Sequence, residues 1–139
     1  MKILPATDIK FGDKTRIIQS GKNKIEEVYN DDNILIKRLI RDEFSRDIDC
    51  KTFDSLGNIL EHQHKDYFSK ENEEGFIETF KSKYQEYTRK AYTKIENGLK
   101  HSIDDFQSKT GKSYFNDFIH DMSGNLVKII NNGKVLNLK

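Results

Sequence analysis

The chain has 139 residues, enough for one compact domain with its own core. Charged residues make up 34% of it and nearly balance, at a net charge of +1, so it lacks the basic excess typical of nucleic-acid-binding proteins. Nine phenylalanines and six tyrosines argue against disorder, and a single cysteine, Cys50, excludes an intrachain disulfide.

The first residues of the chain bear on where the protein works. Residues 1–5 contain no apolar stretch long enough for a signal peptide or a membrane span. A lone cysteine fits a reducing compartment. We therefore expect a cytoplasmic protein that contacts no membrane and forms a single domain over residues 1–139.

One turn layout occurs three times and predicts a β-meander. A ring residue precedes Asp or Asn, two variable residues follow, then Gly or Asn, and the chain returns to aliphatic residues. The copies lie in residues 29–34, 53–59 and 120–126. The Asp or Asn side chain can cap a type I turn, and Gly or Asn accepts the positive φ that closes it. Short runs between turn residues over 14–65 predict antiparallel strands. In the second and third copies of the turn, Gly57 and Gly124 are predicted to have positive φ.

The middle of the chain predicts a helix over about 70–96. Apolar residues fall at 76, 77, 80, 84, 87, 91 and 95, steps of three and four that form one helical stripe. Glutamates crowd its first half and lysines its second half, an order that complements the helix dipole. Asn97-Gly98 can end the helix.

The C-terminal part predicts strands again. Leu99, Ile103 and Phe106 have helical spacing, so residues 99–112 form either a second short helix or an irregular segment ending in a loop over 109–112. Residues 114–121 predict a strand, and residues 126–130 pair with 135–138 across an Asn-Gly turn. The expected fold is α+β: an antiparallel meander with one long amphipathic helix packed on the sheet.

The turn motif carries a resemblance to known repeats. Phe53-Asp54-Ser55-Leu56-Gly57-Asn58-Ile59 and Asp121-Met122-Ser123-Gly124-Asn125-Leu126-Val127 resemble the core of YD and MORN-like β-repeats, and Asn132-Gly133-Lys134-Val135-Leu136 resembles their hairpins. The copies are unevenly spaced, unlike a regular array. Small cytoplasmic proteins with this kind of meander include immunity proteins (antitoxins) encoded beside secreted bacterial toxins. The resemblance therefore implies a toxin or effector as the protein partner.

Three sequence motifs could carry catalytic or binding chemistry. His62 and His64 share a strand face and could bind a metal, but a third ligand must come from far away in sequence, so we interpret them as solvent-facing. His120 and Asp121 point to opposite strand faces, which suits a structural role better than acid–base catalysis. Residues 110–113 lack the first glycine of a phosphate loop. The sequence predicts no enzyme, no metal and no cofactor.

An acidic and aromatic region around the third turn is the predicted partner site. Carboxylates beside aromatic rings suit the blocking of a basic cleft, such as that of a nuclease-type toxin. The predicted contact residues are Asp104, Asp105, Tyr114, Phe115 and Asp117. We expect a stoichiometric binding protein, with no direct nucleic-acid contact.

Two alternatives stay open. One is a small hydrolase or nuclease that uses His62, His64, His101 or His120 with nearby carboxylates. The other is a structural or adaptor domain that dimerises through a sheet edge. The sequence does not fix the oligomeric state.

Overall fold

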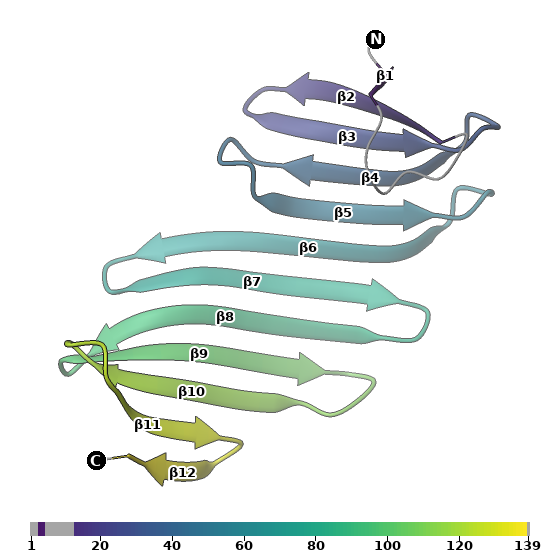
Figure 1. Cartoon of the computed structure of the whole chain (residues 1–139). Helices are drawn as coiled ribbons and strands as arrows, with labels where there is room; N and C mark the ends of the chain where they lie inside the picture. Colours follow the sequence, from purple (N-terminus) through teal and green to yellow (C-terminus); the bar gives the residue numbers. More distant parts are fainter. Residues whose placement is uncertain (1–2, 5–12, 139) are drawn as a thin grey trace. The chain divides into compact units, whose positions relative to one another are not determined.

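Every regular element in the described part of the chain is a β-strand. The computed structural model describes residues 3–4 and 13–138, and the strand order follows the chain order, a meander (Figure 1). Within these residues no helix offers a span that could cross a membrane. The strands of the described chain are β1 (Ile3–Leu4), β2 (Lys14–Ser20), β3 (Asn23–Tyr29), β4 (Leu35–Arg41), β5 (Asp47–Phe53), β6 (Ile59–Lys70), β7 (Glu73–Ser82), β8 (Glu86–Glu96), β9 (Leu99–Ser108), β10 (Tyr114–Asp121), β11 (Leu126–Asn131) and β12 (Lys134–Asn137).

The predicted α+β fold and its helix over 70–96 are wrong. Lys70, the last residue of β6, then β7 and β8 occupy this stretch, with short turns between the strands. Gly75 disfavours a helix, and the Tyr and Thr residues of β8 are strong strand formers. Asn72 and Asn97 have positive φ values of 63° and 53°, so they close hairpins rather than cap a helix.

Residues 99–112 contain neither a helix nor an irregular segment over most of their length. Residues 99–108 form β9, which pairs with β8 and β10 on its two sides, and a loop follows over 109–112, as predicted. The strand over 114–121 and the hairpin across Asn132-Gly133 are confirmed. Apolar steps of four also arise on a strand, because residues i and i+4 share a face.

The three predicted turns are confirmed. Gly57 and Gly124 have φ values of 85° and 90°. In the second copy the Asp54 Oδ1 accepts hydrogen bonds from the backbone N–H groups of Leu56 and Asn58, each at 2.9 Å. A register shift just before each turn marks the bulge that this geometry needs.

A fourth turn with the same capping geometry lies at Asp42, where the sequence pattern did not predict one. Asp42 Oδ1 accepts the N–H groups of Phe44 at 2.9 Å and Arg46 at 3.0 Å, and Ser45 takes the positive φ at 62°. With this copy the turns at Asn30, Asp42 and Asp54 recur every twelve residues. Seven strand residues and five turn residues make one unit, so the copies in β3–β6 are evenly spaced.

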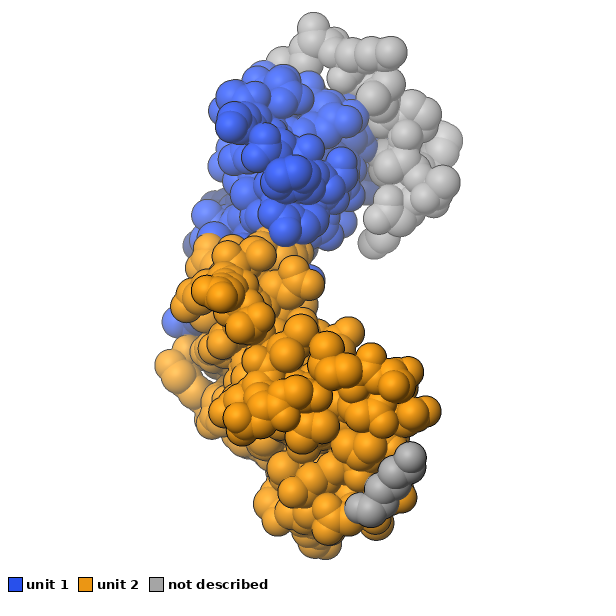
Figure 2. Space-filling model, turned by 90° about the vertical axis from the view of Figure 1, so that its left-hand side faces the viewer, with its two compact units in different colours: residues 1–65, 80–83 blue, residues 66–79, 84–139 orange. Residues whose placement is uncertain are grey.

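The chain forms two compact units, which Figure 2 colours separately. Unit 1 comprises residues 1–65 and 80–83, and unit 2 comprises 66–79 and 84–139. Among described residues, the buried apolar side chains are Leu39 in unit 1 and Ile103 and Ile119 in unit 2. With so few, each unit depends heavily on contacts between side chains of adjacent strands.

Candidate functional site

Two histidines and one aspartate converge on one sheet face of unit 1. His62 and His64 are two residues apart on β6 and therefore share a face. On the neighbouring strand β5, Asp49 lies directly opposite His64, and Lys51 lies opposite His62. The register thus brings the carboxylate of Asp49 between the two rings, and we call Asp49, His62 and His64 the histidine cluster.

The distances within the histidine cluster are short. Asp49 Oδ1 lies 2.6 Å from His62 Nε2 and 3.1 Å from His64 Nδ1. The ring centroids of the histidines are 6.5 Å apart at an interplanar angle of 69°. The Asp49 side chain is only 15% exposed, whereas the histidine side chains are 38% and 42% exposed. The cluster is therefore open to solvent on the side of the rings.

The electrostatics favour the charged form of Asp49. Burial raises the pKa of the Asp49 carboxyl, but hydrogen bonds from His62 and His64 and the positive charge of Lys51 outweigh it, so the pKa lies below its ordinary value. The carboxylate can therefore serve as an anionic ligand at neutral pH.

A second charged group lies farther along the same face of unit 1. Arg38 is opposite Lys51 on β4, but its guanidinium binds the buried Glu27 at 3.0 Å. Glu27 also accepts a hydrogen bond from the Tyr29 hydroxyl at 3.0 Å and lies 3.8 Å from Arg16. The charge of Lys51, like that of His62, favours the ionised form of Asp49.

Sequence reasoning named both histidines but missed Asp49. The signal was present in the turn around Asp54. The register of β5 against β6 follows from that turn. Phe53 pairs with Ile59, Leu60 is skipped at the bulge, and Asp49 then pairs with His64. Among described residues, this cluster is the one group of three or more potential metal ligands whose ligand atoms lie within 4.8 Å of one another.

The structure separates the five predicted contact residues in unit 2. Directly opposed residues of adjacent strands share a sheet face, and consecutive residues alternate. The register opposes Asp104 to Asn116 and Asp105 to Phe115. Asp104 and Tyr114 therefore lie on one face, and Asp105, Phe115 and Asp117 lie on the other.

Two of the predicted carboxylates are already engaged. Arg89 binds Asp104 through two hydrogen bonds of 2.9 Å, and the Tyr114 hydroxyl donates to the same carboxylate at 3.2 Å. The hydrogen bonds with Asp104 raise the pKa of Arg89 above its ordinary value. Asp117 is buried and lies 2.7 Å from His101 Nδ1.

The remaining predicted residues have more open positions. Asp105 accepts a hydrogen bond of 2.8 Å from the Gln107 side chain and lies opposite Lys90, while Phe115 is partly exposed. The engagement of Asp104 and the burial of Asp117 weaken the charge argument for a basic partner.

A row of aromatic rings crosses the strands of unit 2. Tyr67 and Phe76 have ring centroids 5.8 Å apart, and the Arg89 guanidinium lies 5.9 Å from the Phe76 ring. Tyr87 and Phe106 are 4.8 Å apart. Phe106 stacks on Tyr114 at 4.9 Å with an interplanar angle of 8°. Such cross-strand ring pairs stabilise a sheet.

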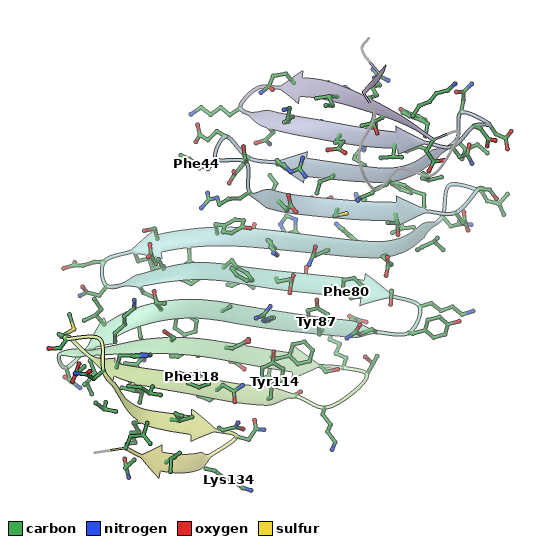
Figure 3. All side chains as sticks on the ribbon, viewed as in Figure 1. Phe44, Phe80, Tyr87, Tyr114, Phe118 and Lys134 are labelled. Carbon is green, nitrogen blue, oxygen red and sulfur yellow. The ribbon has the colours of Figure 1, made fainter. Side chains whose placement is uncertain are left out.

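Aliphatic side chains extend this face toward β12. Phe118 shares the face of Tyr114, because the two are four residues apart on β10, and the register continues from Phe118 to Ile129 and Leu136. Phe118 is 42% exposed and Leu136 is 55% exposed. We define the aromatic face as Tyr87, Phe106, Tyr114, Phe118, Ile129 and Leu136; Figure 3 labels three of these residues.

The other two histidines do not join into one site. His101 shares the face of Asp117, whereas His120 lies on the opposite face, directly across from Lys100. A shallow hollow beside His120 is lined by Lys100, Ser102, Asp121, Met122 and Gly124. Neither histidine therefore gathers several acidic groups around a single cleft.

Comparisons with protein-family models, with curated proteins and with solved structures each found no match.

Proposed function

We propose that this protein acts by stoichiometric binding of a protein partner through the aromatic face of unit 2. The observation that carries the proposal is the apolar row of Phe118, Ile129 and Leu136, of which Phe118 and Leu136 are exposed. Beside this row lie Tyr114 and Arg89, which both bind Asp104. Tyr and Arg are the residue types that most often dominate binding energy at protein interfaces, and apolar side chains form the interface core. Such a face suits a partner surface that is apolar at its centre and polar at its rim.

The nature of the partner rests on the turn motif. The resemblance of the turns at Asp54 and Asp121 to YD and MORN-like repeats supports an immunity protein that neutralises a secreted bacterial toxin in the cytoplasm. Because Asp104 is neutralised by Arg89 and Asp117 is buried, apolar contact supplies the affinity in this proposal. A basic, nuclease-type toxin is one partner that fits the proposal, but the proposed binding does not depend on a positive charge of the toxin. The proposal needs no cofactor, enzyme activity, nucleic acid or membrane.

Dimerisation through the edge strand β12 is a weaker proposal. β12 has four residues, all exposed, and it begins with Lys134 (Figure 3). Short strands and lysines are devices that protect sheet edges from pairing with other chains. The aromatic face is therefore a better candidate for the partner interface than this edge strand.

The test compares two neighbouring residues of β12 that point to opposite faces. Leu136 lies on the aromatic face, and Val135, which is 54% exposed, lies on the other. The protein is co-expressed with the product of the adjacent gene, and binding is measured by calorimetry and by rescue of growth. Leu136→Ser and Phe118→Ser should each weaken binding about tenfold or more, a typical loss for a central interface residue.

Val135→Ser is the matched control and should bind as the unchanged protein does. Equal losses for Leu136→Ser and Val135→Ser would reject the aromatic face as the interface. A dimer in light scattering that Phe118→Ser dissociates would show that this face binds a second copy instead. Turnover of a substrate by the purified chain would overturn the binding-protein proposal altogether.

A further inference from the structure

We infer that Asp49, His62 and His64 bind one divalent transition-metal ion, with Zn²⁺ or Co²⁺ as the probe. This site is distinct from the aromatic face and lies wholly within unit 1. The inference rests on convergence: two imidazole nitrogens and one carboxylate, carried by two adjacent strands, lie with all ligand atoms within 4.8 Å of one another.

The spacing is close to that of a metal site. Zinc bonds of roughly 2.0–2.2 Å to nitrogen and oxygen place tetrahedral ligand atoms about 3.3 Å apart. His64 Nδ1 and Asp49 Oδ1 are 3.1 Å apart, and His62 Nε2 and Asp49 Oδ1 are 2.6 Å apart. Side-chain rotations of the partly exposed histidines suffice to open the shorter distance. The ion then takes the place between each nitrogen and Asp49, while each neutral imidazole keeps its proton on the other nitrogen.

The donor set selects the metal. Two imidazoles and one carboxylate suit Zn²⁺, Co²⁺, Ni²⁺ and Cu²⁺, whereas Mg²⁺ and Ca²⁺ prefer oxygen ligands alone. Three protein ligands leave at least one coordination position for water or for a ligand from a bound partner. The site is therefore open rather than closed, in agreement with the exposure of both histidine rings.

The scaffold holds the ligands without the metal. The Asp54 turn and its bulge fix the register of β5 against β6, and this register sets Asp49 opposite His64. Lys51, opposite His62, opposes a bound cation by like-charge repulsion. Removal of the Lys51 charge should therefore strengthen metal binding, an effect that a purely structural histidine cluster would not produce.

The experiment uses the full chain, stripped of metal with a chelator and titrated with Zn²⁺ in a calorimeter. We expect one equivalent bound per chain, and no binding of Mg²⁺ under the same conditions. His62→Ala and His64→Ala should each weaken Zn²⁺ binding at least about tenfold, because each removes a direct ligand. His120→Ala, which removes a histidine outside the cluster, should leave the affinity unchanged.

A second readout guards against misfolded variants. Co²⁺ should give visible absorption bands in the unchanged protein that His64→Gln abolishes, while circular dichroism shows that the sheet persists. Lys51→Gln should tighten Zn²⁺ binding about two- to tenfold. The inference is overturned if the protein takes up no Zn²⁺ or Co²⁺ at millimolar concentration, or if His62→Ala and His120→Ala bind Zn²⁺ equally well.

Discussion

Gly75 approaches the backbone of Ala91 so closely that a Cβ atom on Gly75 would lie 2.2 Å from the Ala91 carbonyl oxygen. The same atom would lie 2.5 Å from the Cα of Tyr92. Backbone atoms within a strand cannot move aside as the end of a flexible side chain can. Glycine in the interior of β7 is therefore required by close packing, which offsets its low preference for strands.

We expect Gly75→Ala to lower the free energy of unfolding by roughly 1–3 kcal/mol, the usual cost of forcing an extra methyl group into a packed site. Urea unfolding measures it. Gly111→Ala is the control, since a Cβ there would meet only the Ser108 hydroxyl oxygen at 3.6 Å. Equal stability of the two variants would contradict the close packing of Gly75.

The Asp turns predict a graded response at their positive-φ position. Gly124 has φ 90°, and the equivalent residue of the first copy, Asn33, has φ 61°. Gly124→Val should destabilise by about 1–3 kcal/mol, because a β-branched residue is strained in this region. Gly124→Asn should lose less, since Asn tolerates the left-handed conformation. If thermal unfolding shows Gly124→Asn to be less stable than Gly124→Val, this account of the turn is refuted.

Acidification should weaken the Asp54 turn. Hydrogen bonds from Asn58, then from the backbone of Leu56 and Gly57, outweigh slight burial and lower the pKa of Asp54. A carboxyl whose pKa is lower in the folded state stabilises the fold above its ordinary pKa, and that contribution is lost as the pH falls through the folded value. Stability should therefore decline below about pH 4, where free aspartate begins to protonate.

Asp54→Asn separates this titration from the rest of the acid response. Asn30 accepts the same two kinds of backbone hydrogen bond through its amide oxygen in the first turn copy, so Asn can replace Asp without losing the cap. The variant should lose less unfolding free energy than the unchanged protein between about pH 5 and pH 2.5. Identical losses in urea titrations would mean that Asp54 does not contribute.

The sequence predicted strands beside the turns at Asn30, Asp54 and Asp121 and failed where it relied on apolar spacing. Asn30, Asp54 and Asp121 cap turns that the residues alone identify. The helix over 70–96 was predicted from apolar steps of three and four. The alternation of a strand was not visible there, because β7 and β8 carry rings and charges on both faces, as with Arg89 on one face and Lys90 on the other. Apolar–polar alternation marks strands only when one face is buried and the other is wet.

The candidate site residues were likewise predictable beside an explicit turn and not predictable elsewhere. Asp104 and Asp105 look like one acidic patch in sequence, but β9 turns them to opposite faces. That separation could not be predicted while residues 99–112 had no assigned structure. Asp49, by contrast, was within reach of sequence reasoning, because the Asp54 turn fixes which residues of β5 face His62 and His64.

The twelve-residue period has a consequence for how unit 1 folds and melts. From β3 to β6 each strand pairs with the strands just before and after it in the chain, so closing each hairpin orders only a short loop. A protein built from such local pairings resembles a linear array, in which stability is a sum of unit and neighbour terms. Hydrogen exchange along this stretch should therefore rise in steps from strand to strand, with each Asp turn as the border between one step and the next.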